Sequence, residues 1–423
     1  MKTFTFEQIT EIKDYQFITD SSGFILDHEG NLYQFSGNKV EQIVTPEDFL
    51  ISDFHFITES HGAIIGNSRV VKDAVQEGAI GDHVFILFLV FAIPLISKLN
   101  SLGSRTLKRL SSFIAITIMT ISCSNNWQMH KTMDTSSQYV TIITSNQLKN
   151  GQHYYPAIKG QASYVSITND NCKSWVTSKV PTNFHLSNVT AIGENFILSS
   201  YANSKEGSIP IHGDGDIWIY GNDTTYNKEL IKNSPDNPLV IFAQRGIEGL
   251  KYFPEHSLIF AFGTETQPAF PKNEVNSTKG NIYQIPVNLK PKYKIIDVPD
   301  TVSVRSLSIS GSGDLWVTLD NKKPYVSKGT LKYKILDSKR LLRFRNGSWD
   351  DIHVKNVNGF EQVEFIPNSN IGYVLTEQGE IFKSLNNGES WEFYNLSGIR
   401  KIATINNSIT FLKGKNTLLL LSN

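Results

Sequence analysis

Short apolar segments separated by glycine-containing polar turns run through most of the chain. One tetrapeptide pattern recurs, in which a glycine and a polar residue precede an aliphatic and an aromatic residue. It occurs five times: GNLY at 30, GDIW at 215, GNIY at 280, GDLW at 313 and GEIF at 379. Glycine with a polar neighbour favours a turn, and the aliphatic and aromatic residues favour the start of a strand. The pattern therefore predicts a repeated unit of short strands.

Longer matches extend this repeat. FITDSSGFILDHEGNLYQF, from Phe17, matches FIPNSNIGYVLTEQGEIFKS, from Phe365, almost residue by residue, and DFHFITESHGAIIG, from Asp53, repeats the first half. Four short antiparallel strands in about 40 to 50 residues is the period of a propeller blade. The predicted closing hairpins of six units lie at 30–44, 160–180, 215–231, 280–297, 340–354 and 379–395.

The two ends of the chain complete a seventh unit. IRKIATI, SITFLKG and NTLLLLSN supply three C-terminal strands, and KTFTFEQI at 2–9 is expected to supply the fourth. A blade built from both termini closes the ring and leaves no free sheet edge. The expected fold is therefore all-β, a seven-bladed β-propeller closed by N- and C-terminal strands in one blade, although the repeats also allow six or eight blades.

Two apolar runs interrupt the second unit. HVFILFLVFAIPLIS occupies residues 83–97, and LSSFIAITIMTISC ends at Cys123. The loop between them carries Lys98, Arg105, Lys108 and Arg109 and no acidic residue. A spanning helix needs about 20 apolar residues, and basic loops stay in the cytoplasm. We therefore predict an α-helical membrane hairpin at 83–123, inserted in a blade loop, with the propeller on the extracytoplasmic (periplasmic) side.

Two alternatives to the hairpin remain open. The runs could be buried core helices, because both are short for a bilayer. The ending ISCSNN, with Ser122 before Cys123, also resembles lipoprotein signals of Bacteroidota, which makes Cys123 a possible lipid-attachment residue and points to a bacterial cell envelope. The predicted domains are 1–70 (first propeller part), 71–137 (the membrane-hairpin insertion) and 138–423 (the remainder of the propeller).

The octapeptide SLNNGESW at 384–391 has a degenerate copy, TNDNCKSW at 168–175. Both resemble the Asp-box of BNR-type propellers, although Asn386 stands where that family has aspartate and Cys172 replaces its glycine. The residues that match are Ser384, Asn386, Gly388, Trp391, Asp170 and Trp175. A short polar side chain can cap the backbone N–H groups of such a turn, so we expect a structural role at the blade periphery. The half-repeats also resemble photosystem-II-assembly-factor-like and sortilin-type propellers.

Few features indicate enzymatic chemistry. The 40 basic and 40 acidic residues balance, which gives no general attraction to nucleic acid, and two cysteines exclude a cysteine-rich zinc site. HGDGD at 212–216 is explained by a turn. Sialidases share the Asp-box but need an FRIP motif and an arginine triad. Here FRIP is missing, and Arg340, Arg343 and Arg345 crowd into one hairpin that is expected to be a solvated blade edge. We expect no catalytic, cofactor-binding or metal site.

The first functional expectation is a membrane-anchored, non-enzymatic propeller that presents one face or its central channel to a protein or peptide partner. It could be a subunit of a hetero-oligomeric membrane complex, held by residues 83–123. The alternative is a hydrolase or lyase that acts on cell-envelope glycans in the central pocket. Clustered carboxylates on the innermost strands would favour this enzyme.

Overall fold

The computed structural model describes residues 1–46, 49–68, 163–180, 185–201, 217–221, 227–231, 244–269, 274–287, 293–299, 302–327 and 330–422. The chain divides into two units, one formed by Met1–Asn67 and Val140–Asn423 and the other by Ser68–Tyr139. The account below concerns the first unit.

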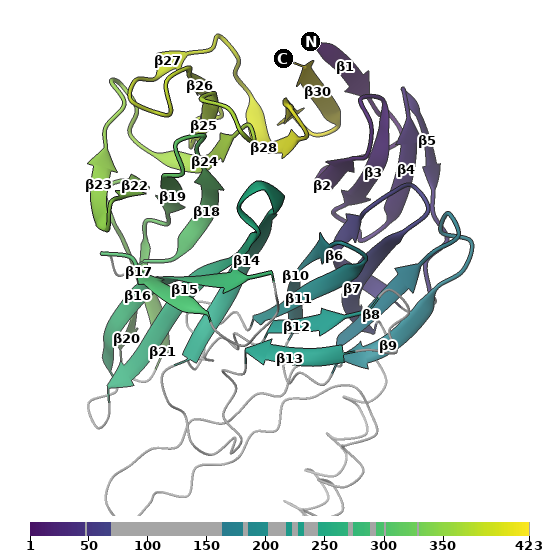
Figure 1. Ribbon diagram of the computed structural model, residues 1–423, viewed down its shortest axis with the longest axis horizontal. Coiled ribbons are helices and arrows are strands. Elements are labelled where there is room, and N and C mark those ends of the chain that lie inside the picture. Colours follow the sequence, from purple (N-terminus) through teal and green to yellow (C-terminus); the bar gives the residue numbers. More distant parts are fainter. Residues whose placement is uncertain are drawn as a thin grey trace, which may run out of the picture. The chain divides into compact units, whose positions relative to one another are not determined.

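The described strands of this unit form seven four-stranded antiparallel sheets, arranged as blades around a ring (Figure 1). Blade 1 consists of β2 (Ile12–Phe17), β3 (Ser22–Asp27), β4 (Leu32–Ser36) and β5 (Lys39–Gln42). Blade 2 consists of β6 (Phe49–Phe56), β7 (Gly62–Ser68), β8 (Ser163–Thr168) and β9 (Val176–Val180). Blade 3 consists of β10 (His185–Ile192), β11 (Asn195–Tyr201), β12 (Ile217–Tyr220) and β13 (Asn227–Ile231). Blade 4 consists of β14 (Gln244–Phe253), β15 (Leu258–Ala269), β16 (Glu274–Pro286) and β17 (Lys294–Asp297).

The remaining blades follow in chain order. Blade 5 consists of β18 (Val304–Ile309), β19 (Leu315–Leu319), β22 (Leu341–Arg345) and β23 (Ser348–Ile352). Blade 6 consists of β24 (Phe360–Phe365), β25 (Gly372–Thr376), β26 (Ile381–Ser384) and β27 (Glu392–Phe393). Blade 7 consists of β28 (Ile399–Ile405), β29 (Ser408–Lys413), β30 (Thr417–Ser422) and β1 (Lys2–Thr5). A single 3₁₀ turn in the described part of the chain, Pro254–His256, links β14 to β15.

The predicted closure of the ring by both termini is confirmed. Strand β1 pairs antiparallel with β30, in the register Lys2↔Leu420 to Thr5↔Thr417. The N- and C-terminal ends accordingly lie side by side in Figure 1. Of the predicted strand 2–9, only the first half is strand, because Phe6 and Ile9 turn inward as fully buried core residues.

The glycine tetrapeptides do not all occupy the same place in a blade. Gly30 and Gly379 adopt positive φ angles of 84° and 79° in the turn before the third strand of their blades. Gly313, with a φ of 85°, lies instead before the second strand of blade 5. Gly280 was expected to form a turn but lies within β16, because β15 and β16 continue pairing to Ala269↔Glu274. Blade 5 also carries an extra hairpin, β20 (Lys322–Ser327) and β21 (Thr330–Ile335), between its second and third strands.

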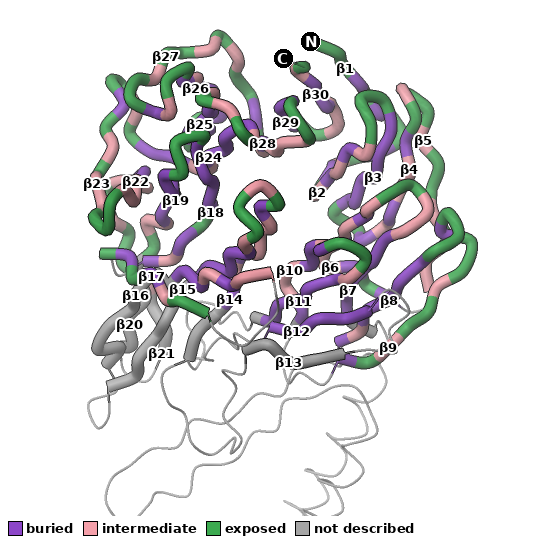
Figure 2. Tube along the Cα trace, viewed as in Figure 1, coloured by how far each residue is buried: buried purple, intermediate pink, exposed green. Residues whose placement is uncertain are grey.

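The hydrophobic core consists of layers between neighbouring blades (Figure 2). Phe24 of blade 1 stacks on Phe56 of blade 2, with ring centroids 3.5 Å apart. Trp316 of blade 5 is fully buried and contacts Phe365 of blade 6, with ring centroids 5.3 Å apart. These contacts lie between blades, so each blade depends on its neighbours for burial of its apolar residues.

The long insertion falls between two paired strands of blade 2. Strand β7 pairs with β8 from Gly62↔Thr168 to Asn67↔Ser163. The predicted hairpin at 83–123, Cys123 and the HGDGD segment lie outside the described residues. Among the residues that are described, there is no helix with the length and apolar character needed to cross a membrane.

A candidate binding site in the central channel

The first strand of each blade faces the centre of the ring, which we call the central channel (Figure 1), and most of these strands carry a β-bulge near their start. In the described strands the bulge lies between Ile12 and Asp14 in β2, and at the corresponding place in β10, β14, β18, β24 and β28. Beyond the bulge, alternate residues lie on opposite faces of the strand. Tyr15, Phe54 and Ile402 pack into the layers between blades, which places their neighbours on the channel side.

This alternation defines two layers of channel residues. The first layer comprises the residue after the bulge and its equivalents: Asp14, Asp53, Asn188, Gly249, Ser306, Gln362 and Lys401. The second layer lies two residues further along each strand: Gln16, His55, Thr190, Lys251, Ser308, Glu364 and Ala403. In β6 the equivalence rests on the match between the Phe17 and Phe56 repeats.

Polar side chains of these inner strands connect each blade to the next. Gln16 exchanges two hydrogen bonds of 2.8 Å with the Phe56 backbone, and the Asp53 carboxylate accepts the Val189 N–H at 2.8 Å. Four more side chains form hydrogen bonds with the backbone of the next blade: Ser187 with Ile247, Lys251 with Leu307, Ser306 with Val363 and Gln362 with Ile402. Lys401 pairs with Asp14 and links blade 7 to blade 1. These bonds hold the ring together around its channel.

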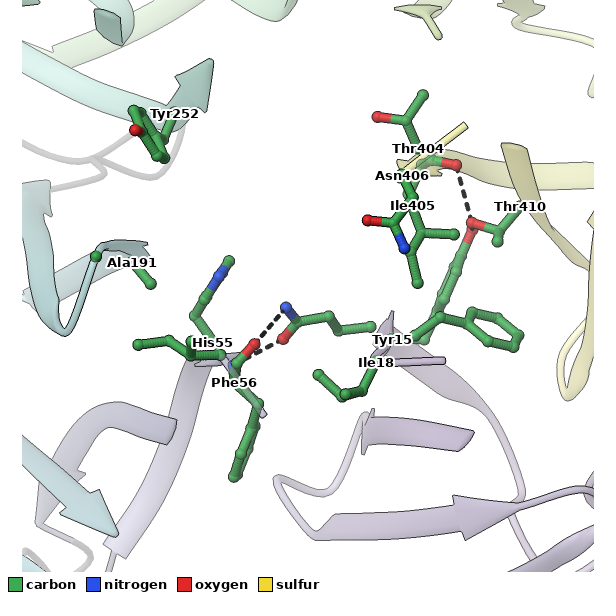
Figure 3. Close-up of a pocket in the computed structure, with 15 residues that line it drawn as sticks. Tyr15, Ile18, His55, Phe56, Ala191, Tyr252, Thr404, Ile405, Asn406 and Thr410 are labelled. Carbon is green, nitrogen blue, oxygen red and sulfur yellow. Dashed lines mark hydrogen bonds between the residues drawn. The ribbon is translucent and has the colours of Figure 1, made fainter. Parts of the chain in front are cut away.

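A cavity of about 400 Å³ opens at one end of the channel (Figure 3). Its walls come from blades 1, 2, 3, 4 and 7. Four polar side chains on the wall have no hydrogen bond with another described residue: His55, Tyr252, Thr404 and Asn406. In Figure 3, His55 lies between Ala191 and Tyr252 on one side and Thr404 to Asn406 on the other. Apolar contact is provided by Ile18, Ile57, Ile405 and Ala191.

Three ionisable groups of the cavity and channel have shifted pKa values: His55, Asp53 and Glu364. Burial lowers the pKa of His55 to about 4, although nearby Asp14 acts in the opposite direction. The imidazole is therefore neutral at pH 7, with one donor and one acceptor nitrogen. Burial, reinforced by the charge of Asp14, raises the pKa of Asp53 to about 7. Burial likewise raises the pKa of Glu364, against the opposing effect of Lys251.

The channel thus contains the clustered inner-strand carboxylates that the glycan-acting alternative would need. Each of them has a partner. Asp14 pairs with Lys401, Glu364 pairs with Lys251, and Asp53 accepts a backbone N–H of the next blade. These partners give the three carboxylates a role in joining the inner strands.

The two octapeptides lie away from the channel, in the turns between the third and fourth strands of blades 6 and 2. Ser384 Oγ accepts the Gly388 N–H at 2.8 Å, and Asn386 Oδ1 accepts the Ser390 N–H at 3.0 Å. In the second copy, Asp170 Oδ1 accepts the Ser174 N–H at 2.9 Å. Both turns are therefore organised by a short polar side chain. Their membership of the Asp-box family stays a prediction.

The tryptophans of these turns differ in their contacts. Trp175 donates its indole N–H at 3.0 Å to the carbonyl of Val44, which lies in the segment between blades 1 and 2. Trp391 packs edge-on against Trp316, with ring centroids 5.8 Å apart. The free thiol of Cys172 is buried, which raises its pKa to about 12. Cys172 is thus part of the hydrophobic core beside its turn.

The solvated edge expected at Arg340, Arg343 and Arg345 is found only in part, because the Arg340 side chain is exposed but that of Arg343 is not. Arg343 and Arg345 belong to β22, the third strand of blade 5, Arg340 directly precedes it, and β23 forms the edge. The Arg343 side chain is only 12% exposed and pairs with Asp350 and Glu389. Arg345 pairs with Asp314. The arginines therefore connect blade 5 internally and to the turn of blade 6.

Sequence reasoning missed the channel residues. A signal was present, because DYQFI at 14–18 and DFHFI at 53–57 place polar residues at alternate positions before a repeated Phe-Ile pair. This alternation marks a strand with one polar face. The hydrophobic repeat predicted the strand, but the polar residues on its other face were not recognised as channel residues.

The fold and its axial cavity define the class of protein as a seven-bladed β-propeller. No protein-family model matches the sequence, and no curated protein matches it. Solved structures do resemble it. The structure "YCF48 bound to D1 peptide" has 10% sequence identity and a TM-score of 0.52, covering 100% of this chain and 96% of that one. YCF48 from Cyanidioschyzon merolae has 11% identity and a TM-score of 0.52, covering 100% and 98%. At this identity the likeness shows the fold.

Proposed function

We propose that this propeller is a non-enzymatic interaction or assembly scaffold that binds a segment of a protein or peptide partner in the axial cavity. The observation that carries the proposal is a set of polar wall groups with no hydrogen bond to another described residue, from His55, Tyr252, Thr404 and Asn406. An extended peptide brings one donor and one acceptor per residue. The polar groups of the wall are neutral, so they can form hydrogen bonds with the N–H and C=O groups of a peptide backbone, and no additional charge is buried by these bonds.

The size and rigidity of the cavity support the same conclusion. Its volume of about 400 Å³ falls within the range of about 300 to 1,000 Å³ of ligand pockets. Its walls belong to five blades whose inner strands are joined by hydrogen bonds, so little conformational freedom is lost on binding. The structural resemblance to YCF48 adds support, because YCF48 has a structure with a bound peptide.

The proposal includes attachment to a membrane. Its support is the pair of apolar runs and the basic loop within 83–123, together with the place of this insertion between two strands of blade 2. Such an insertion would hold the propeller near the bilayer on the extracytoplasmic side, as a subunit of a membrane complex or as a single anchored protein. Lipid attachment at Cys123 would serve the same purpose.

Peptide display tests the binding function. A library of random peptides is selected against the full chain, and binding of the selected peptides is compared with two variants. Asn406→Trp fills the cavity mouth. Asn346→Trp is the matched control, because both asparagines are exposed turn residues with similar positive φ angles of 48° and 51°.

The proposal expects selected peptides whose binding is lost in Asn406→Trp and kept in Asn346→Trp. The backbone strain of the two variants is matched, so a difference between them reports on the cavity. Selection of no peptide, or equal binding to both variants, would show that the cavity is not the binding site.

A further inference from the structure

Below the cavity, three adjacent blades place charged residues side by side. The first-layer residues of blades 7, 1 and 2 are Lys401, Asp14 and Asp53. In blades 1 and 2 the residues two positions further on, Gln16 and His55, line the cavity. One pleat repeat of a strand is about 6.8 Å. The charged residues therefore lie one repeat beneath the cavity wall.

This group carries two carboxylates and one amine. Lys401 pairs with Asp14, whereas Asp53 accepts a backbone N–H from Val189. The side chains of Lys401 and Asp14 are 30% and 28% exposed, so neither is closed off by the surrounding residues. At neutral pH and above, the group carries an excess of negative charge.

Among the described residues, Lys13 donates to the Ser52 carbonyl beside Asp53, and Lys401 is the one cation that forms an ion pair with either carboxylate. Lys251 and Glu364 pair with each other in the second layer. His55 is neutral because burial lowers its pKa, and burial raises the pKa of Tyr15, which keeps its phenol protonated. Lys401 is the cation that acts on Asp53, and it is already bonded to Asp14. A second cation would balance the charge of the second carboxylate.

We propose that the cavity accepts a lysine or arginine side chain of the partner, with its cationic head held by Asp53 and Asp14. This inference rests on the proposed function and names the chemistry of the bound segment. The flexible aliphatic stem of such a side chain spans about one pleat repeat. Ile18, Ile57 and Ile405 offer it apolar contact along the cavity.

A cation in this position would compete with a proton. Burial and the charge of Asp14 make the ionised form of Asp53 unfavourable in the free protein. A bound ammonium or guanidinium group favours that ionised form and lowers its pKa. Binding of the basic side chain is therefore expected to strengthen as the pH rises through 7.

Carboxyl NMR of the full chain, labelled with ¹³C at aspartate, tests this coupling directly. The probes are Nα-acetyl-lysine methylamide and its norleucine counterpart, which differ in the cationic head. With the lysine probe, the Asp53 titration midpoint should move to lower pH by about half a pH unit or more. It should stay in place with norleucine. Asp20, an exposed aspartate of the β2–β3 turn, is the internal control.

Equal effects of the two probes on Asp53 would overturn the inference. The selected peptides provide a second measurement, in which each lysine is replaced by norleucine and each arginine by citrulline. Affinity unchanged by these replacements would also overturn the inference but leave the proposed function standing. Failure of the display selection to yield any cavity-dependent peptide would instead refute the proposed function.

Discussion

The Asp53→Asn substitution should make the protein more stable at alkaline pH. In the folded chain burial and Asp14 raise the pKa of Asp53 to about 7, from an ordinary value of 3.8. Ionisation of Asp53 therefore costs stability progressively as the pH rises from the unfolded pKa to the folded one, and the cost is constant above it. Asparagine does not ionise, and its side-chain oxygen can still accept the Val189 N–H.

The size of this effect follows from the shift in pKa. One pKa unit corresponds to about 1.4 kcal/mol, and about two units of the shift fall between pH 5 and pH 8. The product is about 2.7 kcal/mol, and partial solvation of the channel reduces it, so we expect about 1 to 2 kcal/mol. The variant should gain this much in free energy of unfolding, relative to the native sequence, when the pH is raised from 5 to 8.

Urea unfolding followed by tryptophan fluorescence measures this gain at pH 5, 6, 7 and 8. Asp20→Asn, at an exposed turn, serves as the control and should show no such trend. A difference between Asp53→Asn and the native protein that is independent of pH would refute the reasoning, because it would show that Asp53 titrates alike in the folded and unfolded chains.

Two further predictions concern the turns. Ser384→Ala should lower the free energy of unfolding by about 1 to 3 kcal/mol, because a buried hydroxyl that accepts a backbone N–H is lost. Exposed Ser390→Ala should change it by less than about 0.5 kcal/mol in the same urea assay, and equal effects would contradict the role of the buried hydroxyl. Gly379→Ala should lower the free energy of unfolding more than Gly398→Ala. The Gly398→Ala variant introduces only the strain of a positive φ, which costs about 1 to 2 kcal/mol. At position 379 the added Cβ would also lie 2.9 Å from a carbonyl oxygen of β28, and equal melting temperatures would disprove the clash.

The architecture was readable from the sequence because a propeller repeats one local pattern. The predicted closing hairpins at 30–44, 340–354 and 379–395 correspond to β4–β5, β22–β23 and β26–β27. The closure by β1 and β30 followed from counting strands at the two ends. Local turn chemistry and strand periodicity are sufficient for these elements, since each blade is built from neighbours in sequence.

Elements that depart from the repeat could not be predicted in this way. The GNIY segment has the residues of a turn and strand, yet β15 and β16 continue pairing past Gly280. Pairing with a long partner strand overrides the local preference of glycine for a turn. The extra β20–β21 hairpin similarly shifts the third strand of blade 5 away from its tetrapeptide.

The candidate site depends on contacts between residues that are distant in sequence. Asp14 and Lys401 are separated by almost the whole chain, and they meet only because the termini close the ring. The octapeptides, which have the most distinctive local sequence, instead form turns outside the channel. Residues that share a repeat position become neighbours around the axis, and that relation appears only once the number of blades is known.

The location of a bound peptide tests the central claim most directly. A peptide selected by display is synthesised with a photoreactive benzophenone residue, cross-linked to the full chain, and the attachment sites are mapped by mass spectrometry. The account predicts attachment within the cavity, to residues of β6 and β28 such as His55 and Thr404, and its loss in Asn406→Trp. Attachment to the outer strands of the blades, with no change in that variant, would contradict it.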